Sequence, residues 1–222
     1  MKKETKISSG IKSKGQTMKV WDNYWALTDN FIFSLGLKMH HKTVFNIYKF
    51  LFDSLNLKDP DVIELGSGCG ELTARLIKRY GGSATLVDRS TKGLKKANKI
   101  FKKHNIDATF LKKDLFNFKP KKKFDIVHSE GLIEHFLDEK QKKIIEAHKK
   151  CVKKDGFVLI SVPRPAWYYR ITKWFLEKIN KWPFGFEKAM DKHELKKVLE
   201  DSGLKVLKLL EHNRYSFALA KI

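Results

Sequence analysis

Short apolar runs alternate with amphipathic stretches of helical period from Lys58 to the end of this chain. A short apolar run fits a strand covered on both faces, whereas apolar residues that recur every three to four positions fit one face of a helix. The predicted strands are Asp61–Leu65, Thr85–Val87, Ala108–Lys112, Phe124–Ser129 and Phe157–Val162. The predicted helices between them are Glu71–Tyr80, Thr91–His104 and Asp138–Lys150. This alternation predicts an α/β fold with a doubly wound, mostly parallel sheet and helices on both faces.

The pattern changes after the fifth strand. Residues 163–190 interrupt the alternation of strands and helices. Asp155-Gly156, directly before the fifth strand, is predicted to be a turn. A helix is predicted over Asp191–Ser202, ending at Gly203, and strands over Leu204–Leu210 and Tyr215–Lys221. The short link between these two strands forces them to pair antiparallel. The sheet is therefore predicted to have seven strands with an antiparallel last strand.

The N-terminal part divides into two segments. Residues 1–19 are rich in Lys, Ser, Gly and Thr and predict a flexible basic arm. Residues 20–57 are rich in aromatic side chains and predict a helical cap, with a helix over His41–Leu55. Residues 58–222 are then the main domain, and 163–190 is an insertion in it.

Composition narrows the class of protein. The chain has 222 residues and 42% hydrophobic residues, enough for one domain with a good core. Its two cysteines predict neither a disulfide framework nor a metal site. No apolar run approaches the roughly 20 residues that span a bilayer, and the N-terminus lacks an apolar signal core. The expected compartment is the cytoplasm.

The net charge of +21 comes mostly from lysines spread along the chain. It leaves several interpretations open, among them a nucleic-acid partner and an anionic membrane surface. A third is a lysine-rich, heat-adapted surface, because the chain has only two glutamines, Gln16 and Gln141.

The segment from Val62 to Gly70 reads as a strand followed by a glycine turn, and a helix begins at Glu71. Glycines at 66, 68 and 70 let the backbone turn sharply and let a ligand lie against the main chain. The next strand ends in Asp88, where a carboxylate can accept both hydroxyls of a ribose. A dinucleotide fingerprint requires Gly or Ala at position 71, because a pyrophosphate lies on that helix start. Glu71 would repel a pyrophosphate, so a nucleoside without phosphates fits better.

With these residues the chain resembles the class I (Rossmann-like) S-adenosylmethionine-dependent methyltransferases that act on small molecules or lipids. The resemblance covers Lys58 to Ile222 and implies S-adenosylmethionine (SAM) as the cofactor. It implies that the glycine loop holds the methionine end and ribose, Asp88 the ribose diol, and Asp114 the adenine amino group. The implied cofactor-binding residues are Glu64, Gly66, Ser67, Gly68, Gly70, Asp88, Arg89, Asp114, Leu115, Ser129 and Glu130.

Glu134 and His135 follow the fourth strand, on the side where the acceptor of the methyl group is expected. If the attacking atom carries a proton, a nearby base helps, and His135 is the first candidate with Glu134 second. A structural role stays open as well, because a Glu-His pair at this place is frequent in the family with assorted substrates. The resemblance also implies that the N-terminal cap folds over the site. Trp21, Tyr24 and Trp25 are therefore predicted to contact the acceptor, the alternative being that they pack on the sheet.

The insertion carries a basic amphipathic stretch over residues 166–182, with Trp167 and Tyr168 as further predicted acceptor contacts. Three interpretations stay open: a lid over an apolar small molecule, a membrane-docking helix that admits a lipid, and a dimer contact or core cover. An RNA acceptor is an alternative that the charge favours. Enzymes that methylate exocyclic amines of bases carry Asn/Asp-Pro-Pro-aromatic after the fourth strand, whereas this chain has residues 129–132 as Ser-Glu-Gly-Leu.

Overall fold

The computed structural model describes residues 18–212 and 214–222. Residues 1–17 of the predicted basic arm lie outside this range. The last two residues of that arm belong to the first helix, α1 (Met18–Leu27). In the part of the chain that is described, no helix is both long enough and apolar enough to cross a membrane.

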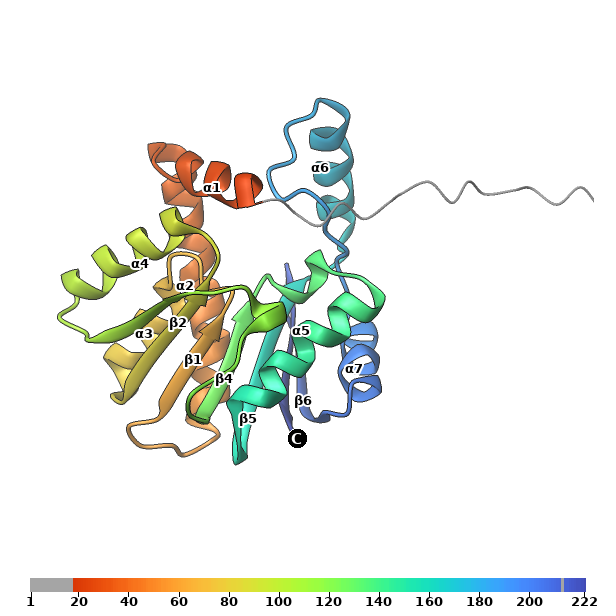
Figure 1. Ribbon diagram of the computed structural model, residues 1–222. Helices are drawn as coiled ribbons and strands as arrows, with labels where there is room; N and C mark the ends of the chain where they lie inside the picture. The colour runs from red at the N-terminus through yellow and green to blue at the C-terminus, as the bar shows by residue number, and fades with distance from the viewer. Residues whose placement is uncertain (1–17, 213) are drawn as a thin grey trace, which may run out of the picture.

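A seven-stranded sheet forms the centre of the molecule, with the strand order β3-β2-β1-β4-β5-β7-β6 (Figure 1). Strands β1 to β5 pair parallel to one another, and β7 pairs antiparallel with both β5 and β6. This confirms the predicted fold class. The strands are β1 (Asp61–Leu65), β2 (Ser83–Asp88), β3 (Ala108–Lys112), β4 (Phe124–Glu130), β5 (Val152–Pro163), β6 (Lys205–His212) and β7 (Tyr215–Lys221).

Helices cover both faces of the sheet, and each face has its own hydrophobic core. On one face α2 (Phe31–Asp53), α3 (Glu71–Tyr80) and α4 (Thr91–Lys103) pack on side chains such as Leu86 and Phe217. On the other face α5 (Asp138–Cys151) and α7 (Lys192–Asp201) pack on side chains such as Val127 and Ile160. Side chains alternate along each strand, so one strand supplies both cores.

Two predicted boundaries differ from the structure by more than two residues. Helix α2 begins at Phe31 rather than His41, and Leu35 and Met39 in its first part are exposed, so the apolar stripe of the sequence did not mark this part. The turn predicted at Asp155-Gly156 lies inside β5, where pairing with β4 skips from Val152 to Phe157. The turn residues therefore mark an irregularity within the strand instead of its start.

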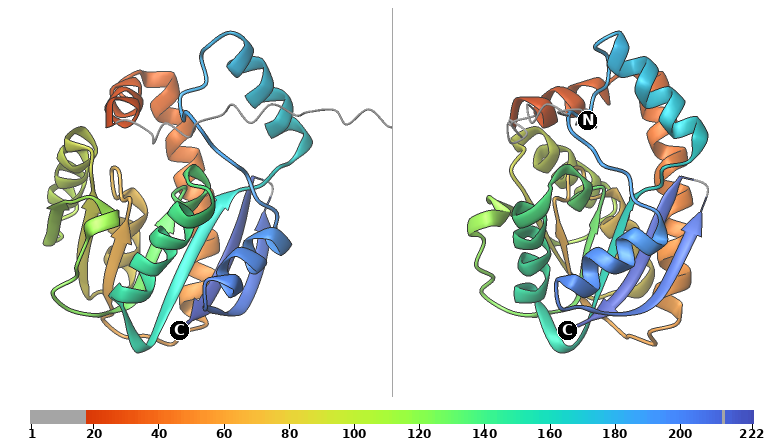
Figure 2. Two further views of the ribbon diagram at one scale, coloured as in Figure 1. Left: turned by 45° about the vertical axis from the view of Figure 1, so that its right-hand side comes forward. Right: turned by 90° about the vertical axis from the view of Figure 1, so that its right-hand side faces the viewer.

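Helices α1 and α6 (Trp167–Lys178) lie beyond one edge of the sheet rather than on its faces (Figures 1 and 2). That edge carries the carboxyl ends of β1, β2 and β4. Phe184, from the segment after α6, contacts Tyr24 of α1 with ring centroids 5.2 Å apart. The two helices thus form a roof above the strand ends.

Candidate functional site

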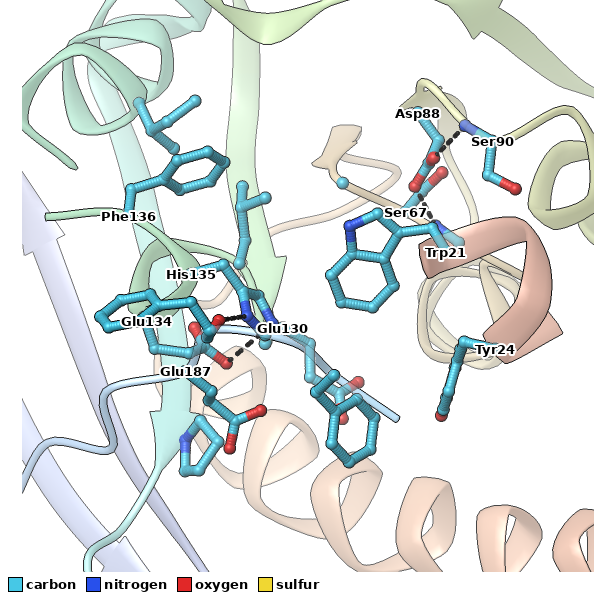
Figure 3. Close-up of a pocket in the computed structure, with 18 of the residues that line it drawn as sticks. Trp21, Tyr24, Ser67, Asp88, Ser90, Glu130, Glu134, His135, Phe136 and Glu187 are labelled. Carbon is cyan, nitrogen blue, oxygen red and sulfur yellow. Dashed lines mark hydrogen bonds and ion pairs between the residues drawn. The ribbon is translucent and has the colours of Figure 1, made fainter. Parts of the chain in front are cut away.

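A cavity of ≈ 1180 Å³ lies between the strand ends and the roof. On one side it is lined by the glycine loop after β1 together with Asp88 and Asp114, which we call the glycine-loop side. On the other side it is lined by Glu130, Glu134, His135 and Glu187, which we call the Glu134 side. Figure 3 shows Asp88 and Ser67 on the first side, Glu134 and Glu187 on the second, and the Trp21 indole between them.

The glycine loop adopts a backbone that side chains would not tolerate. Gly66, Gly68 and Gly70 have φ angles of 70°, 51° and 62°. A Cβ at Gly68 would lie 2.0 Å from the Trp25 ring, and one at Gly70 would lie 2.1 Å from Leu86. The glycines therefore let the loop turn and let α1 approach it closely.

Asp88 is held by backbone amides at the end of β2. Its Oδ2 accepts a hydrogen bond from the Gly68 amide (2.7 Å) and its Oδ1 accepts one from the Ser90 amide (2.6 Å). Asp88 is not the cap of α4, because Ser90 caps that helix by accepting from the Gly93 amide (3.0 Å). The carboxylate is thus fixed at the cavity wall, and each oxygen keeps a second lone pair for a ligand.

Glu64 and Ser67 bring buried polar groups to the same side. Glu64 accepts from Thr73 Oγ1 (2.5 Å), and its burial raises the pKa of the carboxyl to about 8. The buried Ser67 hydroxyl has no hydrogen-bond partner among the residues described. Such a group is costly unless a ligand or water satisfies it.

Asp114 and Arg89 close the outer end of the glycine-loop side. Asp114 Oδ2 lies 3.7 Å from Arg89 Nη1, and its Oδ1 accepts from the Phe116 amide (3.1 Å). Leu115 adds an apolar wall next to them. All the predicted cofactor-binding residues except Ser129 line the cavity.

Ser129 is a correction to the prediction. It is fully buried, and its hydroxyl is hydrogen-bonded to His148 Nε2 of α5 at 2.9 Å. Side chains alternate along β4, so Glu130 points into the cavity and Ser129 points to the opposite face. Ser129 anchors α5 instead of lining the site.

Three buried ionisable groups meet on the Glu134 side. His135 Nδ1 lies 2.8 Å from the Phe186 carbonyl oxygen, and its Nε2 lies 3.9 Å from Glu134 Oε1. Burial lowers the pKa of His135 to about 4, so the neutral ring is a weak proton acceptor at pH 7. Burial also raises the pKa of Glu134 and of Glu187, and Tyr169 Oη donates a hydrogen bond to Glu187 Oε1 (2.5 Å).

Glu130 has a different environment from its neighbours. Its Oε1 lies 2.5 Å from His40 Nε2, from helix α2. Although burial acts to raise the pKa of Glu130, the neighbouring histidines His40 and His41 outweigh it and lower that pKa. Glu130 is therefore ionised and has a partner.

Aromatic side chains of the roof enclose the cavity. The Trp21 ring meets the His135 ring edge to face at 4.9 Å, and the Tyr24 ring meets the Trp25 ring at 4.9 Å. All three predicted cap residues line the cavity, as does Tyr168. Trp167 is a correction: it does not line the cavity and is 74% exposed, because it lies on the outer face of α6.

Sequence reasoning missed several residues of the Glu134 side. The cavity is also lined by Tyr169, Phe184, Phe186 and Glu187 of the insertion and by His40 of α2. None of these belongs to a local motif. The helical spacing in the insertion, which puts Tyr169 and Thr172 on one face, is the only pattern in the sequence that indicates some of these cavity-lining residues.

The chain matches known proteins at the level of a family. A family model described as a methyltransferase domain matches residues 38–209. No curated protein matches the chain in a sequence search.

Solved structures with the same fold are similar over most of the chain. One is magnesium protoporphyrin IX methyltransferase from Synechocystis PCC 6803 with bound SAH, with 21% identity, 86% of each chain covered and a TM-score of 0.66. Another is an S-adenosylmethionine-dependent methyltransferase from Clostridium acetobutylicum ATCC 824, with 17% identity, 91% of this chain and 98% of that chain covered, and a TM-score of 0.66. A third is the DhpI–SAH complex, with 19% identity, coverage of 92% and 96%, and a TM-score of 0.65.

Proposed function

The chain belongs to the methyltransferase-domain family, and from this premise we propose that it methylates a small, partly apolar or lipid-like acceptor. It is a methyltransferase with S-adenosylmethionine as its cofactor. The proposal for the acceptor is carried by one observation. The cavity that contains the glycine loop continues under an aromatic roof, which leaves room for a second, apolar molecule.

The residues of the glycine-loop side fit a nucleoside without phosphates. The Ser67 hydroxyl is buried and unsatisfied by the described residues, and Asp88 is held so that its oxygens face the cavity. Glu71 lies in the first turn of α3, where its carboxylate is paired with Arg75 (2.7 Å). The Glu71 carboxylate would repel a pyrophosphate at this helix start, whereas it would not repel a cationic cofactor.

The protein's part in the reaction is mainly to position two molecules. When bound, SAM supplies a methyl group on a sulfonium, which a correctly aligned nucleophile can accept. The glycine loop and Asp88 bind and orient the adenosine part, while Trp21 and Tyr24 exclude water. The acceptor lies between Trp21 and Glu134. The role of His135 or Glu134 as a base stays a prediction, and the low pKa of His135 disfavours it as a proton acceptor.

The acceptor class can be tested directly. The protein is incubated with SAM labelled in its methyl group and a fractionated extract of host cells. We expect label in a small molecule that partitions into organic solvent. Label confined to the RNA or protein fraction would contradict the proposal.

Helix α6 favours the lipid-like version of the acceptor and contact with an anionic membrane. Its outer face exposes Trp167, Ile171, Trp174 and Phe175, and no residue of the helix is buried. Its inner face lines the cavity through Tyr168, Tyr169 and Thr172. Together with the net charge of +21, a basic helix with exposed aromatic side chains is suited to an anionic membrane surface. We propose that α6 lies on such a surface beside the cavity.

The membrane contact is tested by cosedimentation with vesicles that contain anionic phospholipid, at low salt. We expect binding, and we expect the double variant Trp174→Ala, Phe175→Ala to weaken it about tenfold or more, since it removes two exposed anchors. Leu207→Ala is the control, because it removes an exposed apolar side chain from β6. Absence of vesicle binding by the unmodified protein would contradict the proposal. If the unmodified protein is a dimer and the double variant is a monomer, α6 serves self-association instead.

RNA is the competing acceptor class, and the charge of +21 is its support. The carboxyl groups of the half-buried Glu130 and of the buried Glu134 and Glu187 line the cavity and would disfavour a phosphate backbone there. Filter binding of bulk tRNA at several salt concentrations separates the two. A steep fall of affinity with salt, together with label in the RNA fraction, would favour RNA.

A further inference from the structure

Glu134, His135 and Glu187 lie in an arrangement that the positioning of a cofactor does not explain. Each offers one ligand atom to a common point, and these atoms all lie within 4.8 Å of one another. Three equally spaced ligand atoms with bonds of about 2.0–2.2 Å to one divalent cation lie at most about 3.8 Å apart, and about 3.5 Å apart in a tetrahedral site. The most widely separated ligand atoms of the three side chains therefore need to approach one another by about 1 Å to bind one.

Two hydrogen bonds to backbone carbonyl oxygens, one from a side chain and one from an amide, hold the two parts of this cluster together. The His135 ring is bonded through Nδ1 to the Phe186 carbonyl oxygen (2.8 Å), and the Lys188 amide donates to the Glu134 carbonyl oxygen (2.9 Å). Glu187 lies between these two contacts in the sequence. The insertion is thus fixed so that Glu187 faces the Glu134-His135 pair that follows β4 (Figure 3).

Glu134 provides an independent observation that points to a ligand. Its side chain is 1% exposed and lines the cavity, and neither carboxylate oxygen has a hydrogen-bond partner among the residues described. The other acidic residues of the cavity wall differ in this respect, because Glu64 is bonded to Thr73 and Glu130 to His40. A buried carboxyl group without a partner is costly, and a bound cation removes that cost.

We propose that Glu134, His135 and Glu187 bind one divalent metal ion at the acceptor end of the cavity. Two carboxylates and an imidazole suit Mn²⁺, Fe²⁺ or Zn²⁺ better than Ca²⁺, which prefers oxygen ligands only. Three protein ligands leave coordination positions open toward the cavity. An acceptor that carries a hydroxyl, or two neighbouring oxygen atoms, binds at those positions. This inference rests on the proposed function and specifies the acceptor as an oxygen compound.

The test is metal binding by the untagged full-length chain after treatment with a chelator. Mn²⁺ is titrated into the protein, and free Mn²⁺ is followed by its electron paramagnetic resonance signal. We expect one Mn²⁺ to bind per chain and Zn²⁺ to displace it. Glu134→Gln and Glu187→Gln each remove a ligand oxygen and should weaken Mn²⁺ binding by about 100-fold or more, since even indirect partners of a metal site cost about 10–100-fold.

Glu200→Gln is the matched control. Glu200 is an exposed carboxylate on α7, paired with Lys196, and its replacement should leave Mn²⁺ affinity within about twofold. Glu134→Gln is expected to fold, because the amide has the shape of the carboxyl group and removes a buried acid. Its fold is checked by its thermal unfolding temperature and by its affinity for S-adenosylhomocysteine (SAH).

Two results would overturn the inference. One is the absence of stoichiometric Mn²⁺ or Zn²⁺ binding by the unmodified chain, in which case the two carboxyl groups are a protonated pair only. The other is unchanged metal affinity in both Gln variants. The proposed function fails separately, if the unmodified chain does not bind SAH. Binding of SAH without binding of metal leaves the methyltransferase assignment intact and removes only the metal site.

Discussion

The polar groups of the glycine-loop side of the cavity are mostly bonded to the protein already, whereas Glu134 on the opposite side is not. Asp88 accepts from two backbone amides, and Glu64 accepts from Thr73. Neither oxygen of Glu134 has a hydrogen-bond partner among the residues described, and its nearest ionisable contact is His135 Nε2, 3.9 Å from Oε1. The first side is therefore organised before a ligand arrives, and the second side needs a ligand to complete it.

The two sides also differ in how the chain builds them. The glycine-loop side comes from residues 64–70 and the ends of the next two strands, which the parallel sheet brings to one edge. The Glu134 side combines β4 and the segment after it with α1, α2 and the insertion. One side is set by local motifs and the other by tertiary packing. This predicts that substitutions separate cofactor affinity from fold stability and from acceptor chemistry.

The largest expected effect is on the glycine loop. Gly68→Ala places a Cβ 2.0 Å from the Trp25 ring at a φ of 51°, so the loop must move. We expect SAH affinity to fall about 100-fold or more, from strain of about 1–3 kcal/mol and the displaced loop together. Calorimetric titration measures it, with circular dichroism as a check of the fold.

Gly36→Ala is the control for that substitution. Gly36 lies in α2, and a Cβ there meets nothing within 4 Å. SAH affinity should stay within about twofold, because no strain of the kind expected at positive φ arises. If Gly68→Ala also leaves the affinity unchanged, the loop is not preorganised for the cofactor.

A smaller effect is expected from the proton on Glu64. Burial raises the pKa of Glu64 to about 8 from the ordinary 4.5. Between these two pH values the folded protein keeps the proton on Glu64, whereas the unfolded chain has lost it. The stabilisation is fully present below pH 4.5 and is lost as the pH rises through 8. Between pH 6 and 7.5 the unfolding free energy should fall by about 2 kcal/mol relative to Glu64→Gln.

Chemical denaturation of both proteins at these two pH values measures the difference. The buried histidines His128 and His148, whose pKa values burial lowers, are present in both proteins and largely cancel. The amide of the variant imitates the protonated acid, so its curve should be flatter. Parallel pH dependence in the two proteins would contradict the raised pKa.

A comparison of two serines gives the smallest expected loss of SAH affinity. Ser129→Ala leaves the buried Nε2 of His148 without its partner and should cost about 1–3 kcal/mol of stability, with SAH affinity within about twofold. Ser67→Ala should do the reverse, weakening SAH by about 3–10-fold with little change in stability. Denaturant unfolding and calorimetry on both variants decide this. An affinity loss in Ser129→Ala without a stability loss would return Ser129 to the site.

Much of the glycine-loop side could be predicted from the sequence. The residues between Val62 and Glu71 form strand, turn and helix locally, and Asp88 follows at the end of the next strand. The prediction that Ser129 binds the cofactor was wrong because side chains alternate along β4. Since Glu130 points into the cavity, Ser129 points to the opposite face of the sheet.

The Glu134 side could be predicted only in part. Glu134 and His135 follow β4 directly, so the strand-end rule found them. Glu187 and His40 reach the cavity because the insertion and α2 fold back over it, and no spacing in the sequence encodes that contact. Trp167 was misplaced because a helix turns by about 100° per residue, which sends it to solvent while Tyr168 faces the cavity.

The most direct test of the cofactor site is the affinity of SAH for the unmodified protein and for Asp88→Ala, measured by calorimetric titration. We expect one SAH to bind per chain and its affinity to fall about 10–100-fold in the variant, because hydrogen bonds to a carboxylate contribute about 1.5–3 kcal/mol. Equal affinities for the two proteins, or binding of a pyrophosphate-containing nucleotide in place of SAH, would contradict the assignment of this site.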